Sequence, residues 1–179
     1  MNSSGHFLVF DLTKIGTAYQ IINSFADADT VNVFEISPIG SQALLILMCK
    51  DLSASQLFYN QCISLFKSEI IDCVLIENID DQVVDAYLSQ NQSVLQSNML
   101  VVETNTFAKA FLCAHKLQQK KLSVIDFRAV RTSPPNLIIV CSDELEQEML
   151  NFMESNPFVK TTFIPQTSAI LKSYFNIIK

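Results

Sequence analysis

The 179-residue sequence contains one pattern twice, and this repeat restricts the possible folds more than any other feature. An apolar run at 7–10 ends in Asp11, and a similar run at 99–102 ends in Glu103, an offset of 103 − 11 = 92 residues. Later matches follow an offset of 93 after one inserted residue (124 − 31 = 93). The further matches are Ile15 with Phe107, Ala18 with Ala110, Val31 with Val124, Leu44 with Leu137 and Ile71 with Ile164. Solenoid units have periods of roughly 20–50 residues, so the sequence predicts two copies of one small domain, at 1–92 and 93–179.

The composition limits the partners that such a chain is expected to have. Apolar residues make up 49% of the sequence and the mean hydropathy is +0.28. The longest apolar run, 43–49, is far shorter than the ~18 residues that span a membrane, and the N-terminus lacks the segments of a secretory signal. A net charge of −6 disfavours binding to nucleic acid phosphates. We therefore expect a cytoplasmic protein with no membrane and no nucleic acid partner, whose extra apolar residues contact other protein chains.

The sequence shows no set of catalytic or cofactor-binding residues. The common hydrolase, metalloprotease and nucleotide-binding motifs do not occur, and three glycines leave no phosphate-binding loop. Five cysteines form no CxxC pair and are expected to be reduced and packed. His6 lies far from His115, and Cys113 with His115 offers too few ligands for a metal. We therefore predict that the protein is not an enzyme and holds no cofactor and no metal, with acidic residues such as Asp80 at helix ends.

Both copies show the same order of predicted elements. The first copy contains strand 7–12, helix 15–25, strand 31–36, turn 37–42, strand 43–49, helix 53–66 with Ser53 as N-cap, strand 70–76 and helix 80–88. The second contains strand 99–103, helix 106–120, strand 123–130, turn 131–136, strand 137–141, helix 143–153, strand 159–164 and helix 168–176, after a polar linker at 89–98. This order predicts an α+β fold of two tandem ferredoxin-like domains, each βαββαβ plus a C-terminal helix. The apolar run at 43–49 is expected inside its sheet.

Three short segments resemble the bacterial microcompartment (BMC) shell proteins. The family's repeat begins with a strand that ends in Glu-Thr, as at 101–104, and carries an Ile-Gly-Ser loop between its second and third strands, as at 39–41. An Ile-Pro-Arg-Pro segment precedes its last helix, and Ile-Pro-Gln-Thr at 164–167 is similar. The chain thus resembles a divergent tandem-domain BMC protein. The resemblance implies BMC-like domains, with three chains forming a pseudohexameric ring around a central pore.

In such a ring, the loops between the second and third strands alternate around the axis. The resemblance implies a pore lined by Ser37, Pro38, Ile39, Gly40, Ser41 and Gln42 from the first copy and by Arg131, Thr132, Ser133, Pro134 and Pro135 from the second. Gly40 has no side chain and is therefore suited to close approach at an axis. The alternative interpretation is that both segments are ordinary β-hairpin loops without a role in a pore. Arg128 and Arg131 are expected to be solvated surface residues rather than an anion site. Neither loop contains a cysteine, so no iron–sulfur cluster is expected.

Lateral contacts between rings depend, in the family, on a lysine near the end of the first helix and on the arginine of Ile-Pro-Arg-Pro. The resemblance implies that Lys116, Lys120 or Lys121 supplies the lysine in the second copy, and Gln166 stands in place of the arginine. The first copy has Asp27 and Asp29 near the end of its helix instead.

Three functions follow as hypotheses. The resemblance implies a structural shell protein, a homotrimer whose partners are other shell proteins and small metabolites selected at the pore by size and charge. A second hypothesis is a regulatory protein of paired ACT-like domains that binds a small molecule between them. A third is a soluble trimeric adaptor with the BMC fold that does not tile into shells. The mass of the assembly separates the two trimeric hypotheses from the regulatory one.

Overall fold

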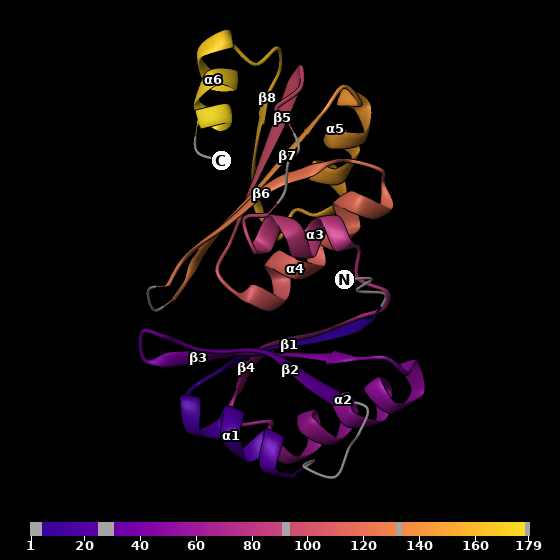
Figure 1. The fold of residues 1–179 in the computed structure, drawn as a ribbon, viewed down its shortest axis with the longest axis vertical. Coiled ribbons are helices and arrows are strands. Elements are labelled where there is room, and N and C mark those ends of the chain that lie inside the picture. Colours follow the sequence, from indigo (N-terminus) through magenta and orange to yellow (C-terminus); the bar gives the residue numbers. More distant parts are fainter. Residues whose placement is uncertain (1–4, 25–30, 91–93, 132–133, 178–179) are drawn as a thin grey trace.

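The computed structural model describes residues 5–24, 31–90, 94–131 and 134–177. Each half of the chain forms a four-stranded antiparallel sheet with helices packed against it (Figure 1). The first half contains β1 (His6–Leu12), α1 (Ile15–Ser24), β2 (Val31–Ile39), β3 (Gln42–Cys49), α2 (Leu52–Phe66), β4 (Ile70–Ile76) and α3 (Asp81–Tyr87). The second half contains β5 (Asn98–Thr104), α4 (Phe107–Gln119), β6 (Val124–Val130), β7 (Asn136–Asp143), α5 (Glu146–Ser155), β8 (Lys160–Ile164) and α6 (Ala169–Ile177). The predicted α+β class and the repeated βαββαβ-plus-helix order are confirmed.

The two sheets have the same topology. The first has the strand order β2-β3-β1-β4 and the second the order β6-β7-β5-β8. In the first sheet the apolar strand β3 lies inside, between β2 and β1, as predicted. Successive side chains of a strand point to opposite faces, and consecutive residues Leu44, Leu45 and Ile46 are all fully buried. Both faces of this sheet are therefore covered, and the chain is a duplication of one fold.

The third strands of the two halves match at a larger offset than predicted. Leu8 of β1 pairs with Leu47, and its counterpart Leu100 of β5 pairs with Cys141. Leu47 therefore corresponds to Cys141, an offset of 141 − 47 = 94 residues, and the predicted offset of 93 is wrong by one. A slip of one residue in a strand is hard to see in a continuous apolar run, because every position is then hydrophobic.

The fourth strands match at a smaller offset than predicted. Leu8 also pairs with Leu75, and Leu100 with Phe163, so the offset is 163 − 75 = 88 residues. The predicted match of Ile71 with Ile164 is therefore wrong, since Ile164 corresponds to Ile76. The difference arises mainly in the preceding helix, because α5 has 10 residues where α2 has 15.

Side-chain caps fix the start of three helices. Asp51 caps α2 and accepts the backbone N–H of Ala54 at 2.7 Å, so the predicted N-cap, Ser53, is wrong and lies inside the helix. Asp80 caps α3 by accepting the N–H of Gln82 at 2.8 Å, as predicted for an acidic residue at a helix end. Thr106 caps α4. Aspartate and threonine are both favoured at this position because their side chains satisfy an N–H of the first turn.

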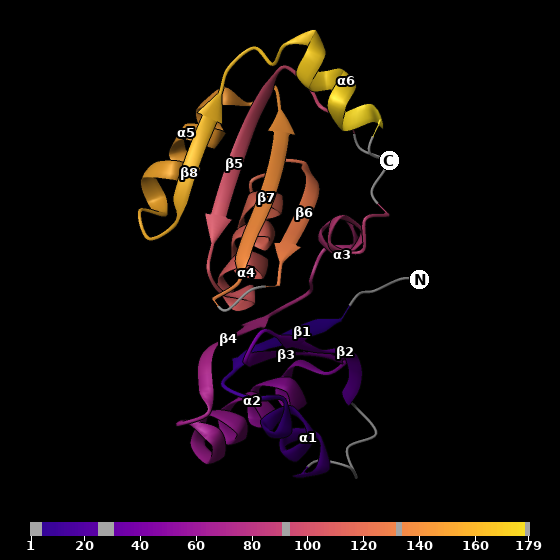
Figure 2. The same cartoon turned by 90° about the vertical axis from the view of Figure 1, so that its left-hand side faces the viewer.

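The helices and sheets are stacked in layers (Figures 1 and 2). Helices α1 and α2 cover one face of the first sheet. Helices α3 and α4 lie on its other face, between the two sheets, where α4 contacts β1 and β4 as well as β5 and β7. Helix α5 lies on the same face of the second sheet as α4. Helix α6 packs against the opposite face of the second sheet, which is otherwise uncovered in Figure 2.

The largest core cluster contains residues from both halves. Phe7 and Val9 of β1 are fully buried beside Phe107 and Phe111 of α4, and the rings of Phe7 and Phe111 lie 6.2 Å apart between centroids. Full burial of such a side chain contributes roughly 1.5–3 kcal/mol. Two small domains thus share one hydrophobic core, which is consistent with the expectation that small domains gain from burying surface against each other.

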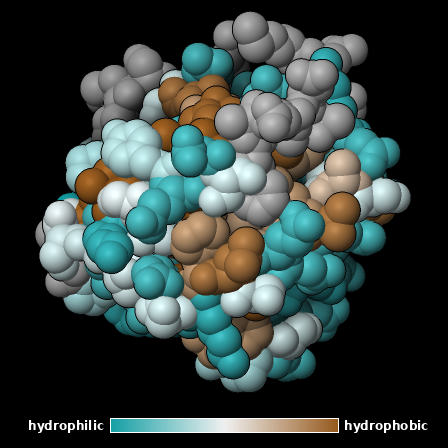
Figure 3. Space-filling model, turned by 90° about the horizontal axis from the view of Figure 1, so that it is seen from below, coloured by the Kyte–Doolittle hydropathy of each residue, from teal (hydrophilic) through white to brown (hydrophobic). Residues whose placement is uncertain are grey.

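The outer surface carries scattered apolar side chains. Seen from below, the face formed by α1 and α2 shows apolar residues among hydrophilic ones (Figure 3). Tyr19 of α1 and Leu57 and Leu65 of α2 are all more than half exposed. No helix in the described part of the chain is long and apolar enough to cross a membrane.

Candidate functional site: the two hairpin loops and the junction between the halves

The first hairpin loop is shorter than predicted. Ile39 of β2 pairs with Gln42 of β3, which leaves only Gly40 and Ser41 outside the strands. Gly40 has φ = 58°, and two-residue hairpin loops require this left-handed conformation, which glycine adopts without steric cost. The predicted turn at 37–42 is therefore too long. Four of its residues belong to the strands: Ser37, Pro38, Ile39 and Gln42. Pro38 is tolerated since β2 is an edge strand.

The second hairpin loop is three residues longer. Val130 of β6 pairs with Asn136 of β7, so five residues, 131–135, connect the strands instead of two. Pro134 is exposed and Pro135 buried, while Thr132 and Ser133 lie outside the described residues. The two loops therefore differ in length, although the sequence predicted turns of equal length at 37–42 and 131–136.

Arg131 joins the second loop to the first half of the chain. Its Nη2 donates to Oε1 of Glu35, in β2, at 2.8 Å, and its guanidinium lies 6.0 Å from the ring of Phe107. Both hairpins consequently lie on the same side of the molecule, at the left of Figure 1. The chain thus brings together the two loops that the resemblance assigned to a pore.

Glu35 is the centre of this connection. Its carboxylate also accepts the hydroxyls of Ser37 and of Tyr87, the latter at 2.5 Å. Burial tends to raise the pKa of Glu35, but the hydrogen bonds from Ser37, Tyr87 and Arg131 outweigh this and lower it. Burial and the hydrogen bond to Glu35 raise the pKa of Tyr87. An ionised Glu35 therefore holds Arg131 between the loops, and this role was not predicted from the sequence.

The two arginines considered for the pore are partly exposed, but both are paired. Arg128 donates to Asp126 at 2.5 Å and lies 5.9 Å from the ring of Phe175, on α6. Arg131 is held by Glu35. Neither guanidinium is a simple solvated cation, and each is directed to a carboxylate of its own chain.

A second connection between the halves lies at the start of α4. The carboxylate of Asp11, at the end of β1, accepts the backbone N–H of Phe107 at 2.9 Å and that of Ala108 at 2.8 Å. Asp72 of β4 accepts the hydroxyl of Thr106 at 2.6 Å. Burial raises the pKa of Asp11 to about 6, although the two N–H donors oppose the shift. The sequence offered one signal for this contact, an acidic residue at the end of an otherwise apolar strand.

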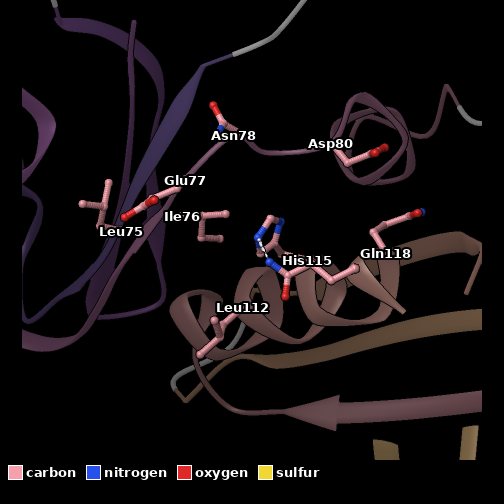
Figure 4. Close-up of a pocket in the computed structure, with 9 residues that line it drawn as sticks. Leu75, Ile76, Glu77, Asn78, Asp80, Leu112, His115 and Gln118 are labelled. Atoms are coloured by element: carbon pink, nitrogen blue, oxygen red, sulfur yellow. Dashed lines mark hydrogen bonds between the residues drawn. The ribbon is translucent and has the colours of Figure 1, made fainter. Parts of the chain in front are cut away.

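A cavity lies at the junction of the halves, between the β4–α3 connection and α4 (Figure 4). Its volume is about 580 Å³, and its polar lining includes Glu77, Asn78, Asp80, His115 and Gln118. Burial lowers the pKa of His115, whose Nδ1 is buried without a hydrogen-bond partner and whose Nε2 bonds to Gln119. Among the described residues, no three His, Cys, Asp or Glu side chains are placed to bind a metal.

The residues proposed for lateral contacts lie in the second half of the chain. Nζ of Lys116 donates to Asn156 at 3.1 Å, and Lys120 pairs with Glu148 at 3.4 Å. Lys121 and Gln166 both have positive φ, 62° and 52°, at the turns that follow α4 and β8.

The cysteines are packed as predicted. Cys49, Cys62, Cys113 and Cys141 are buried, and Cys73 is partly buried. Burial raises the pKa of each thiol, to about 12 for Cys62 and about 11 for Cys113. Thiols with raised pKa values are poor nucleophiles at neutral pH, because the thiolate is the reactive form.

Comparison with known proteins supports the fold. No protein-family model and no curated protein matches the sequence. The crystal structure of a microcompartment protein from Desulfitobacterium hafniense DCB matches with a TM-score of 0.74 and 15% sequence identity, over 94% of this chain and 98% of that one. Aspartokinase alpha and beta subunits also match, over 86% of this chain and 92% of theirs, at 10% identity, but a TM-score of 0.33 carries no argument. The chain therefore has the fold of a microcompartment protein along nearly its whole length.

Proposed function

We propose that this protein is a structural shell protein of a bacterial microcompartment. Three chains form a ring of six domains, 1–92 and 93–179 from each chain, around a central opening for small metabolites. The protein is not an enzyme; it acts in the cytoplasm, in contact with other shell proteins. The proposal extends the likeness in fold to a likeness in role.

The position of the two hairpin loops is the observation that carries this proposal. Arg131 and Glu35 join the two loops on one side of the chain, so a threefold axis on that side brings six loops together. The loops differ by three residues, so such an opening has threefold and not sixfold symmetry. Selection then depends on loop bulk near Gly40 and on the residues of 131–135.

Measuring the mass of the purified protein by light scattering tests the ring directly. A mass three times that of the chain supports it, and particles with a central opening in electron micrographs complete the test. A monomer or a dimer contradicts the proposal. Formation of sheets or closed shells on mixing with other shell proteins separates the shell role from that of a soluble trimeric adaptor.

A regulatory ligand-binding protein is the second candidate. The cavity of about 580 Å³ between the halves favours it, because paired regulatory domains hold their effectors at such a junction. A thermal-shift screen with amino acids and nucleotides tests this role. A saturable rise in melting temperature that disappears in His115→Leu, together with a mass below that of a trimer, supports the second candidate over the first.

A further inference from the structure

The contact between the two halves uses two different surfaces. One is the face of the first sheet that carries Val9, Asp11 and Leu44, and the other is the outward side of α4 with Phe107 and Phe111. A head-to-tail contact of this kind leaves one surface unused on each half, because each half also carries the equivalent of the surface that the other half contributes. The unused surfaces are the equivalent face of the second sheet and the outward side of α1.

The second sheet has a face equivalent to the one that α4 covers in the first sheet. Val101 corresponds to Val9 (101 − 9 = 92), and Ile138, which pairs with Glu103, corresponds to Leu44, which pairs with Asp11. Val9 and Leu44 are fully buried. Val101 and Ile138 are only partly buried. In Figure 2, α6 lies at one end of this face of the sheet and leaves the rest of the ribbon uncovered.

Helix α6 is the counterpart of α3 in the order of elements, but α3 contacts β6 and α4 rather than its own sheet. At the fourth-strand offset of 88, Leu171 corresponds to Val83 and Phe175 to Tyr87. Leu171 and Phe175 pack on the second sheet, as Val83 and Tyr87 pack on the core between the halves. Because α4 packs beside Val9 and Leu44 on the first sheet, the partly exposed place around Val101 and Ile138 is the one where a helix equivalent to α4 belongs.

Helix α1 is the equivalent of α4, and its outward side is exposed. Tyr19 corresponds to Phe111 (111 − 92 = 19), and Gly16 to Ala108 (108 − 92 = 16). Phe111 is fully buried in the junction, whereas Tyr19 is 58% exposed. A Cβ added at Gly16 meets no atom within 4 Å, so the first turn of α1 is open to a partner.

The acidic residue of the junction is also repeated. Glu103 corresponds to Asp11, and its carboxylate contacts Lys160 at 3.0 Å at a side-chain exposure of 28%. The N–H groups of a first helical turn have no partner within the helix and attract negative charge. Asp11 satisfies those of Phe107 and Ala108, whose counterparts in α1 are Ile15 and Gly16.

We propose that α1 of a second copy packs on the open part of the second sheet, and that Glu103 accepts the N–H groups of Ile15 and Gly16 of that copy. This inference rests on the proposed ring and identifies the contact that closes it. Each chain then uses both surfaces, Tyr19 is buried against Val101 and Ile138 of its neighbour, and the Glu103 site is complete only between chains.

Charge reversal tests the contact. In Glu103→Lys the side chain faces the positive end of α1, so the dissociation constant between subunits is expected to rise at least about tenfold. Glu154→Lys, with the same charge change at an exposed position of α5, is the control and is expected to leave the dissociation constant unchanged. Sedimentation equilibrium over a dilution series measures both, and circular dichroism checks that each variant is folded.

Cysteine pairs locate the contact independently. A 1:1 mixture of Glu103→Cys and Gly16→Cys proteins, after subunit exchange and mild oxidation, is expected to give a chain-to-chain disulfide. Glu103→Cys mixed with Gln61→Cys, which is exposed on α2, is expected to give none. A trimer that forms no such disulfide and is unaffected by Glu103→Lys overturns this contact while the ring stands. A monomeric protein overturns both.

Discussion

The carboxylate of Asp11 accepts the backbone N–H of Ala108 at 2.8 Å, although 97 residues separate them in the sequence. This hydrogen bond and the equivalent one to Phe107 join the last residues of β1 to the first turn of α4. Both helix residues are almost completely buried, so water does not replace the carboxylate there. The contact therefore determines how the halves are placed, and with them the two hairpin loops.

Replacing Asp11 with alanine is expected to lower the free energy of unfolding by about 1–3 kcal/mol, because two buried N–H groups lose their acceptor. Urea denaturation at pH 5 measures the change. Asp85→Ala, an exposed aspartate on α3, is the control and is expected to change the value by less than about 0.5 kcal/mol. Equal effects of the two substitutions contradict the role given to Asp11.

The same residue is expected to make stability depend on pH. Burial raises the pKa of Asp11 from 3.8 to about 6, so between these values the folded protein binds more protons than the unfolded one. The contribution of Asp11 to the free energy of unfolding therefore falls as the pH rises from about 4 to 6, at up to about 1.4 kcal/mol per pH unit. The difference between the wild type and Asp11→Ala is expected to shrink over this range. A difference that is constant from pH 4 to 7 contradicts the prediction.

At the first hairpin, Gly40→Val is expected to destabilise the protein by about 1–2 kcal/mol, because φ = 58° is unfavourable for a residue with a Cβ and more so for a β-branched one. Asn32→Val, at an exposed position of the edge strand β2, is the control: valine is favoured in strands, so stability is expected to change by less than about 0.5 kcal/mol. Thermal denaturation monitored by circular dichroism compares the two. A neutral Gly40→Val shows that the loop tolerates another turn type.

Around Glu35, Tyr87→Phe is expected to cost more than Arg131→Met. The Tyr87 hydroxyl donates to the carboxylate in a largely buried place, and such hydrogen bonds to charged groups contribute about 1.5–3 kcal/mol. The guanidinium of Arg131 is 41% exposed, where ion pairs contribute roughly 0–1 kcal/mol. Denaturant titration of both variants and of the double variant gives the two energies and their coupling. The opposite ranking means that Arg131 is the main partner of Glu35.

On α1, Tyr19→Asp is expected to weaken the association of subunits while leaving the stability of the single chain unchanged, because Tyr19 is 58% exposed. Leu57→Asp removes a side chain with 61% exposure from α2 and is the control. Analytical ultracentrifugation measures the association and urea denaturation the stability. Association that responds equally to both substitutions points to a different surface.

The repeat itself was sufficient to predict the order of elements, because apolar periodicity survives in both copies. The matches between later strands were wrong where connections differ in length: periodicity carries no information on how many residues a loop or helix contributes. Ser53 was predicted as the N-cap because the apolar pattern placed the helix at 53–66. Helix α2 begins at Leu52, and Asp51 therefore occupies the N-cap position. Such boundaries are the least certain part of a prediction from sequence.

The placement of the halves was not predictable from the repeat, although one signal was present. Helix α4 has seven buried residues, whereas α1 has three. A helix that is apolar around most of its circumference is enclosed on several sides, and this distinguished α4 from its copy. The Glu35 cluster had no such signal, because its members, Tyr87 and Arg131, lie 52 and 96 residues from Glu35.

The core shared by both halves affects how the chain is made. During synthesis the first half leaves the ribosome before α4, so the face of the first sheet with Phe7 and Val9 is not covered by α4 until residues 107–119 have emerged. Exposed apolar sheet surface of this kind favours aggregation. The nascent first half is thus expected to depend on chaperones or on prompt translation. Its hydrophobic core is complete only when α4 of the second half packs on the first sheet.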